Sequence, residues 1–369
     1  MIDRPRGVRL ARLARALASA CSLTVIAVSG AGCASCERAG QGVISLMGGT
    51  INDPSNKSLR RGMLSFGLDR ACSEMSAKPA GLREGGETNG SATNPVNGRF
   101  FAKTCSVTTA EDGDLIISFS GSGWAWASGV RKVTFDASAT ARFDQDFFLS
   151  GDDLYGYLRT KDVSKPQVTL KVIESTPMAI AERLSGFGER YARAMLADKL
   201  KDGMTVRRRK SGETDFRAGI VELGTWPALA YATPSGAPIF NDRAEVHEQQ
   251  RDFIGPIEVP DDSSMAIASL RIDGVDALNV LVVDDSTGKT WIDQYLASAA
   301  ATPPPARPLQ QLVAHQGTDL TVQLPSKGRY WIVLDNTSTI AGGVAPPGHM
   351  LDDRAAVVSY AVAVGAKGK

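Results

Sequence analysis

The chain has 369 residues, of which 43% are hydrophobic and 22% are charged, an ordinary mixture for a globular protein. It carries 41 lysines and arginines against 40 aspartates and glutamates, so its formal net charge is +1. Proteins that bind nucleic acid carry a marked basic excess, so we expect no nucleic-acid partner. The length is sufficient for two domains, each with its own core.

The N-terminus has the pattern of a secretory signal peptide. A run of uncharged, mostly apolar residues, 16–28, follows a basic stretch that contains Arg4, Arg6, Arg9, Arg12 and Arg15. The run is shorter than the roughly 20 residues that a membrane-spanning helix needs. It is also continuous rather than periodic, which argues against an amphipathic helix that stays in the fold. We therefore expect residues 1–32 to be a signal peptide.

Small residues lead to a cysteine directly after the apolar run, in the order Ser29-Gly30-Ala31-Gly32-Cys33. This resembles the bacterial lipobox, although Gly30 stands where that motif has a branched apolar residue. The resemblance implies that Cys33 is acylated and becomes the N-terminus, with Cys36 as the alternative site. It also implies a protein anchored by its lipid in the cell envelope, at the outer membrane or on the periplasmic face.

Cys72 and Cys105 are the cysteines that remain in the folded part of the chain. We expect them to form a disulfide, because the envelope is an oxidising compartment. Acylation of Cys33 would leave Cys36 unpaired, whereas acylation of Cys36 would leave no odd cysteine. The choice between the two acylation sites therefore stays open.

Residues 33–57 are rich in glycine and are expected to form a flexible tether. Residues 58–224 are expected to form an α+β domain. Short apolar runs separated by turn signals predict an antiparallel sheet there, and the clearest run places Val133, Phe135, Ala137 and Ala139 on one face.

One long amphipathic helix is predicted over residues 177–202. Thr176 can cap it, Pro177 suits its first position and Gly203 suits its end. Apolar residues between Ile180 and Leu200 recur at helical spacing, although Gly186 and Gly188 weaken the middle.

Residues 225–252 begin rich in proline, alanine and glycine and end rich in charge, so we expect a linker. From residue 253 to residue 369, six or more short β runs without a helix predict an antiparallel β-sandwich, interrupted by a proline-rich loop at 303–308. The fold class expected for the whole chain is mostly β.

Two segments near the C-terminus resemble GOLD-like and related jelly-roll accessory sandwiches. One runs from Gly328 to Ser338 and contains Tyr330-Trp331 and Asp335-Asn336-Thr337, and the other contains Ser359-Tyr360. The resemblance implies a binding or adaptor module rather than a catalyst.

The segment from Asp284 to Thr290 follows an apolar strand and ends in Gly-Lys-Thr. A phosphate-binding loop needs a glycine where Val283 stands, and the carboxylates of Asp284 and Asp285 would repel phosphate. We therefore expect a polar hairpin turn.

Other signatures of catalysis or metal binding are missing from the sequence. It has no Gly-x-Ser-x-Gly or His-Glu-x-x-His motif, and its three histidines lie far apart. The carboxylates Asp144, Asp146, Asp152 and Asp153 match no calcium loop and are expected in turns. We expect no cofactor, metal or catalytic residue.

Two groups of side chains are candidates for contact with other molecules. Trp124 and Trp126 alternate with small residues and either pack in the core or, with Phe187 and Tyr191 of the predicted helix, face a ligand. The basic run Arg207, Arg208, Arg209 and Lys210 either contacts an anionic surface or is a solvated strand end that deters edge pairing.

These features favour a non-enzymatic, lipid-anchored envelope protein with a binding or structural role. The first domain would hold an apolar ligand between its sheet and helix, and the partner would be an envelope protein or a lipid. The alternative is a secreted hydrolase, which needs two carboxylates about 5–9.5 Å apart in a cleft. The sequence does not indicate an oligomeric state.

Overall fold

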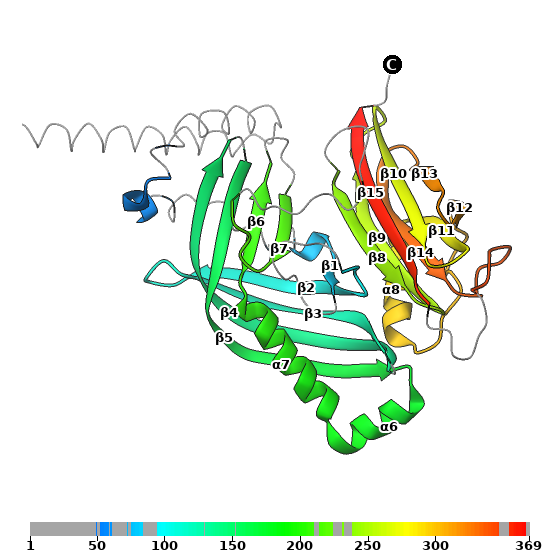
Figure 1. Cartoon of the computed structure of the whole chain (residues 1–369), viewed down its shortest axis with the longest axis horizontal. Coiled ribbons are helices and arrows are strands. Elements are labelled where there is room, and N and C mark those ends of the chain that lie inside the picture. The colour runs from blue at the N-terminus through cyan, green and yellow to red at the C-terminus, as the bar shows by residue number, and fades with distance from the viewer. Residues whose placement is uncertain are drawn as a thin grey trace, which may run out of the picture.

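The computed structural model describes residues 49, 52–58, 60, 72, 75–83, 94–128, 130–151, 153–209, 214–223, 231, 238–346 and 354–366. These residues form a curled antiparallel sheet with two helices, followed by a sandwich of two antiparallel sheets with one helix (Figure 1). The prediction of a mostly β chain is confirmed. We call the curled sheet and its helices the first domain, and the sandwich and its helix the second domain.

The first domain is a meander in which each strand pairs with the next along the chain. Its seven strands are β1 (Ala80–Leu82), β2 (Gly98–Thr109), β3 (Leu115–Ala127), β4 (Arg131–Ser150), β5 (Asp153–Ile173), β6 (Met204–Arg208) and β7 (Thr214–Ala218). The long strands β4 and β5 bend, so that their far ends rise with β6 and β7 away from β2 and β3 (Figure 1). The predicted alternation is confirmed, because Ala137, Ala139 and Ala141 are buried on one face of β4.

The single long helix predicted from the sequence is two helices, α6 (Thr176–Ser185) and α7 (Phe187–Lys201). Gly186 between them has a φ of +56°, a left-handed conformation that glycine adopts without strain and that ends a helix. The Glu182 carboxylate then accepts the N–H groups of Gly188 at 2.6 Å and Glu189 at 3.0 Å, which are orphan donors at the start of α7.

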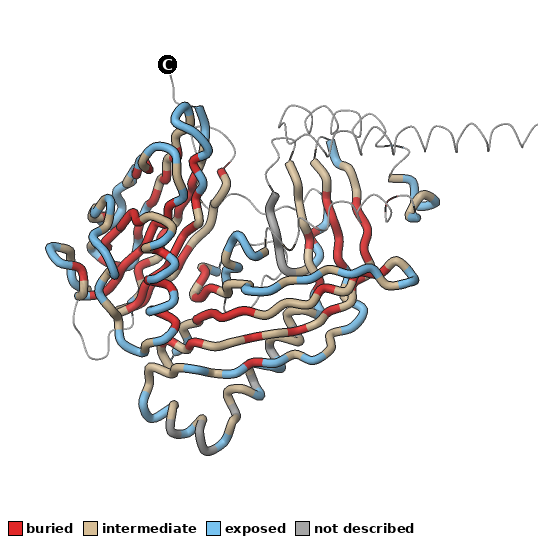
Figure 2. The backbone as a smooth tube through the Cα atoms, turned by 180° about the vertical axis from the view of Figure 1, so that it is seen from behind, coloured by how far each residue is buried: buried red, intermediate tan, exposed pale blue. Residues whose placement is uncertain are grey.

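The second domain packs two sheets face to face. Their strands are β8 (Phe240–Val246), β9 (Gln250–Val259), β10 (Ser264–Asp273), β11 (Ala277–Asp284), β12 (Gln310–His315), β13 (Asp319–Gln323), β14 (Gly328–Asn336) and β15 (Ala356–Ala366). One sheet has the order β13-β10-β15-β8 and the other the order β12-β11-β14-β9. Leu270, Val280, Ile332 and Val358 are fully buried between them, where Figure 2 shows much of the buried backbone.

Two expected boundaries differ from the structure. Strand β8 falls inside the stretch predicted as linker, and it pairs with β15. Its charged residues suggested a loop, but Ala244 and Val246 alternate with them and are buried. The predicted tether ends early as well, because Asn52 exchanges hydrogen bonds of 2.7 and 2.9 Å with the backbone of Leu149, ahead of the short 3₁₀ helix η1 (Pro54–Asn56).

The polar turn expected at residues 284–290 is instead the start of a helix, α8 (Asp285–Ala297). The Asp284 side chain caps it, accepting from the Ser286 hydroxyl at 2.6 Å and the Thr287 N–H at 2.9 Å, and these bonds lower the pKa of Asp284 to about 2. None of the helices in the described part of the chain has the length and apolar character needed to traverse a bilayer.

Cys72 and Cys105 form a disulfide, as the sequence predicts. Their Cα atoms are 5.2 Å apart and they are separated by 33 positions. Closing a loop of that length stabilises a fold by about 3–4 kcal/mol on the chain-entropy model. The bond joins the segment that precedes β1 to the middle of β2.

The two domains meet through buried polar contacts. The Arg99 guanidinium on β2 donates to both carboxylate oxygens of Asp252 on β9, at 2.7 and 2.5 Å, and to the Tyr360 hydroxyl on β15 at 3.1 Å. Arg99 is 5% exposed and Asp252 4%. Burial alone would lower the pKa of Arg99, but the adjacent Asp252 carboxylate raises it well above its ordinary value.

Main-chain hydrogen bonds reinforce this junction. Val96, just before β2, forms a parallel bridge with Ala244 on β8, with bonds of 2.8 Å to the backbone of Arg243 and Glu245. Since β8 is an edge strand of its sheet, the first domain covers part of an edge that would otherwise be open.

We predict that Asp252→Asn lowers the free energy of unfolding by about 3–5 kcal/mol, because it leaves a buried guanidinium uncompensated. Urea denaturation of the variant and the parent protein measures this difference. Lys289→Gln is the matched control, because it breaks an exposed pair with Asp285 and should cost less than about 1 kcal/mol. Equal denaturation midpoints for Asp252→Asn and the parent protein would contradict the prediction.

Candidate functional site

Three phenylalanines lie together on one face of the first domain's sheet. Phe100 on β2 and Phe135 on β4 are both paired with Gly123 on β3, and Phe119 lies further along β3. The rings of Phe100 and Phe135 are nearly parallel, at 6° and 6.4 Å between centroids, and the Phe119 ring meets Phe100 edge-on at 5.9 Å. All three side chains are only partly buried. We call this group the aromatic platform.

The platform depends on two glycines of β3. A Cβ atom at Gly121 would lie 2.8 Å from Cζ of Phe100, and one at Gly123 would lie 2.9 Å from Cζ of Phe135. The two rings therefore lie across β3 where it has no side chains. A glycine inside a strand often marks such a close approach.

The residues of β3 and β4 that flank the platform are apolar. Pairing between β3 and β4 puts alternate residues of the two strands on this face, namely Phe119, Gly121, Gly123 and Ala125 of β3 and Val133, Phe135, Ala137 and Ala139 of β4. None of these residues carries a charge or a side-chain hydrogen-bonding group. The face therefore suits contact with a hydrocarbon surface.

Helix α7 lies over the same face along β5. Leu170 is paired with Phe135 and so shares its face, and the Leu170 N–H donates to the Glu189 carboxylate on α7 at 3.0 Å. Near the other end of the helix, the Thr160 hydroxyl donates to the carbonyl of Leu200. Figure 1 shows α7 running back along β5 toward β6. The helix thus borders the platform on its β5 side.

The tryptophans proposed as ligand-facing lie on the opposite face of β3. Trp124 alternates with Gly123, is 2% exposed, and packs against Phe253 of β9 at 5.8 Å and Tyr295 of α8 at 5.2 Å. Trp124 therefore packs in the core and does not face a ligand. Trp126 stacks on His247 at 3.4 Å between ring centroids. Phe187 and Tyr191 belong to α7, but their side chains lie outside the described residues.

A buried lysine lies beside these aromatic residues. Lys132 on β4 is 1% exposed, and its ammonium group donates to the carbonyls of Tyr295 at 3.2 Å and Ser298 at 2.6 Å, at the C-terminus of α8. The same ammonium group lies 3.9 Å from the centre of the Tyr295 ring. Burial lowers the pKa of Lys132 to about 8, with Glu174 opposing the shift and Arg251 adding to it.

The basic run lies at the far end of the first domain's sheet. Arg207 pairs with Asp153 at 2.9 Å and lies over the Tyr155 ring, whereas Arg208 and Arg209 are partly buried. Arg207 and Arg208 stand at the end of β6, as expected, but β6 lies between β5 and β7, so these charges do not protect an open edge. Lys210 lies outside the described residues, and contact of this run with an anionic surface stays a prediction.

The carboxylates around Phe147-Phe148 pair with cations rather than gather around a metal position. Asp144 pairs with Lys57 at 3.0 Å and Asp146 with the buried Arg60 at 2.7 Å. Asp152 lies outside the described residues. Within the described ranges, no group of three or more histidine, cysteine or acidic residues could hold a metal ion.

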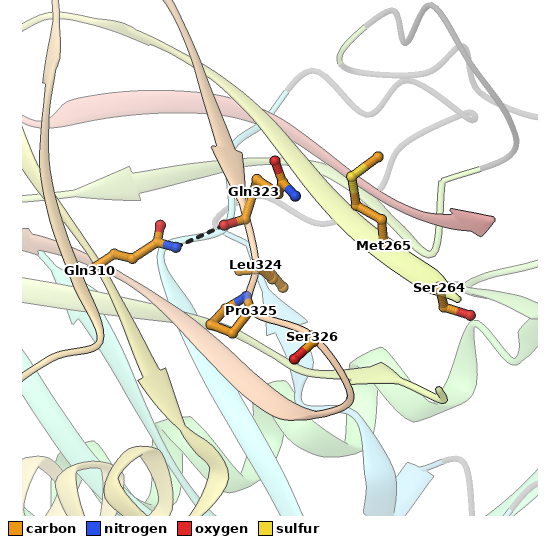
Figure 3. A pocket seen from close by; sticks show the side chains of 7 residues that line it. All are labelled: Ser264, Met265, Gln310, Gln323, Leu324, Pro325 and Ser326. Atoms are coloured by element: carbon orange, nitrogen blue, oxygen red, sulfur yellow. Dashed lines mark hydrogen bonds between the residues drawn. The ribbon is translucent and has the colours of Figure 1, made fainter. Parts of the chain in front are cut away.

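A shallow depression opens on the second domain between the ends of β10, β12 and β13 (Figure 3). Met265 and Leu324 contribute to its lining, and the Gln310 amide donates across it to the carbonyl of Gln323 at 2.9 Å. Its lining also includes Ser264, Pro325 and Ser326, and none of the lining side chains is charged.

No protein-family model matches this chain, and no curated protein matches it. Among solved structures, a glycoside hydrolase family 43 arabinoxylan arabinofuranohydrolase from Bacillus subtilis, in complex with cellotetraose, aligns at 9% identity and a TM-score of 0.22, covering 71% of this chain and 66% of that chain. A family 32 beta-fructofuranosidase from Bombyx mori aligns at 9% identity and a TM-score of 0.12, covering 71% and 65%. The alignments thus span just under two thirds of each enzyme's chain. Similarity this low carries neither fold nor function to the present chain.

The platform was not singled out from the sequence. The sequence shows the alternation around Phe135, but it does not show that Gly121 and Gly123 lie inside one continuous strand. Pairing of β2 and β4 on either side of a continuous β3 brings the three rings together, and that pairing is a tertiary feature.

We predict that the stability of the protein rises with pH between about 8 and 10.4, and that Lys132→Met flattens this rise. The folded-state pKa of Lys132 is about 8 and lies below the unfolded value of about 10.4, so the unfolded state binds more protons in this window. Across the whole window, the free energy of unfolding should rise by an amount on the order of 3 kcal/mol. Urea denaturation at several pH values measures it for both proteins, and parallel curves would contradict the assignment.

Proposed function

We propose that this chain is an exported, lipid-anchored protein of the bacterial cell envelope, and that its first domain holds an apolar ligand of the lipid type on the aromatic platform. One observation carries the ligand part of the proposal. The platform presents three partly exposed aromatic rings, its flanking residues on β3 and β4 have no polar side chains, and α7 lies along one side. A soluble domain normally covers such a surface or uses it to bind.

Sequence and fold features together support the export part. The basic stretch, the apolar run and the cysteines at 33 and 36 are features of an exported lipoprotein. The Cys72–Cys105 disulfide agrees with an oxidising compartment. Asn52 already contacts the first domain, through a hydrogen bond to Leu149 on β4. Only the chain between the acylated cysteine and Asn52 would therefore separate the lipid from that domain.

The second domain is proposed to act as an interaction module with a fixed position relative to the platform. The residues that carry its resemblance to GOLD-like sandwiches are engaged internally. Asp335 binds the buried Arg251, and Tyr360 accepts a hydrogen bond from Arg99 of the first domain. A partner would therefore bind other surfaces of the sandwich.

A carboxylate-dependent hydrolase is the less favoured function. A general acid must stay protonated near neutral pH, which requires a raised pKa. The buried carboxylates of the described residues are each engaged in ion pairs: Asp114 with Arg142 and Lys161, Asp146 with Arg60, Asp252 with Arg99 and Asp335 with Arg251. This arrangement suits structural ion pairs better than proton transfer.

The ligand proposal predicts that lipid co-purifies with the protein and that the double variant Phe100→Ala, Phe135→Ala loses it. Each ring lost should weaken binding about tenfold or more, because burying a phenylalanine is worth roughly 1.5–3 kcal/mol. Native mass spectrometry of protein purified from its own envelope measures the bound fraction. Phe240→Ala is the control, because Phe240 is a partly buried ring of the second domain. Parent protein with no lipid adduct would overturn this function.

The anchor is tested separately by metabolic labelling with palmitate. We predict that Cys33→Ala abolishes labelling and that Cys36→Ala leaves it intact. The reverse pattern would identify Cys36 as the acylated residue, and labelling of neither the parent protein nor the variants would exclude the lipid anchor.

A further inference from the structure

The disulfide lies on the same face of the sheet as the aromatic platform. Cys105 on β2 is paired directly with Phe119 on β3, so both side chains point to one side of the sheet. Cys105 also packs against the buried cluster on that face that contains Leu115, Ile117 and Phe143. The bond therefore holds Cys72 above the apolar face.

The chain that follows Cys72 returns to the sheet as β1. We call residues 75–83, which the structure describes throughout, the strap. Ala80 pairs with Phe100 and Leu82 with Gly98, so the strap's C-terminal end is hydrogen-bonded to β2. Arg83 at that end also pairs with Asp242 of the second domain at 2.6 Å.

The disulfide fixes the chain just ahead of the strap. The two attachment points on β2 are Phe100, through pairing with Ala80, and Cys105, through its bond to Cys72. They are five positions apart on β2, at most about 17 Å at the usual rise, with a register shift between Ala102 and Thr104. The strap thus starts beside Cys105 and ends at β1, and it borders the β2 side of the platform, as α7 borders the β5 side.

Apart from the disulfide, the described contacts of the strap gather at β1, where three residue pairs join it to β2 and Arg83 contacts the second domain, while Lys78 lies over the Phe240 ring of the second domain at 5.1 Å. A strand of three residues is at the short limit for a stable pairing. Among the described contacts, the covalent bond is what joins the chain just ahead of the strap to β2 near Phe119.

We propose that the Cys72–Cys105 disulfide is a clasp that keeps the strap against the β2 side of the platform and slows the exchange of the apolar ligand. This inference rests on the proposed ligand-binding function. A dithiol reductant opens the clasp by thiol–disulfide exchange. The Cys72–Cys105 bond breaks, each cysteine gains a proton as a thiol, and the reductant becomes its own disulfide, which accounts for the two electrons.

The test uses the full exported chain with N-phenyl-1-naphthylamine as a fluorescent apolar probe. The probe's dissociation rate is measured by stopped flow for the oxidised protein, for protein reduced with dithiothreitol, and for the variant Cys72→Ser, Cys105→Ser. We expect the reduced protein and the variant to release the probe about tenfold faster than the oxidised protein. Dithiothreitol should leave the rate of the double variant unchanged, which controls for other effects of the reductant.

Equal dissociation rates for oxidised and reduced protein, with binding that still depends on Phe100 and Phe135, would overturn the clasp and leave the binding function standing. Absence of probe binding to every form would overturn the binding function and the clasp together. Far-UV circular dichroism checks that the forms stay folded. Should the double variant fail to fold, Cys72→Ala replaces it, since this change keeps Cys105 in the buried cluster.

Discussion

The buried pairing of Arg99 with Asp252 is the interaction on which the arrangement of this protein depends. An arginine of the first domain enters the second domain, where a carboxylate and a tyrosine hydroxyl satisfy three of its hydrogen bonds. Neither charge could stay buried without the other. The pair therefore ties the orientation of the curled sheet to that of the sandwich. Trp124 and Lys132 then complete the junction by packing on α8.

The same junction decides which face of the first domain is open to other molecules. Residues of β3 alternate between the two faces, so Trp124 and Trp126 point to the second domain while Gly121 and Gly123 face away from it. The tryptophans pack in the contact between the domains and are not available to a ligand. The glycines instead make room for Phe100 and Phe135, which form the platform that we propose as a ligand site. The disulfide and α7 border that platform on its two sides. The proposed ligand site and the disulfide that would slow ligand exchange therefore lie on one face of the sheet.

Part of this fold could be read from the sequence, because some features depend on local pattern alone. The alternation through Phe135 and Ala137, the pairing of Cys72 with Cys105 and the apolar strands of the sandwich all follow from residue type and spacing. Strand β8 and the start of helix α8 could not be predicted in this way. In β8, the buried residues Ala244 and Val246 alternate with charged residues, so the segment resembles a polar loop. Asp284 caps a helix because Trp291 and Tyr295, further along that helix, are buried in the core of the protein. An apolar surface near the helix was predictable in kind, but the residues of the platform were not.

The sequence by itself determined the strand-rich fold class and the disulfide, since the first is set by local residue patterns and the second by the supply of cysteines. Only the tertiary structure decided which aromatic residues are buried and which face outward. Trp124 and Phe119 belong to one strand and are both large and apolar, and nothing local separates their roles. Their side chains point to opposite faces of β3, and the second domain covers only one of those faces.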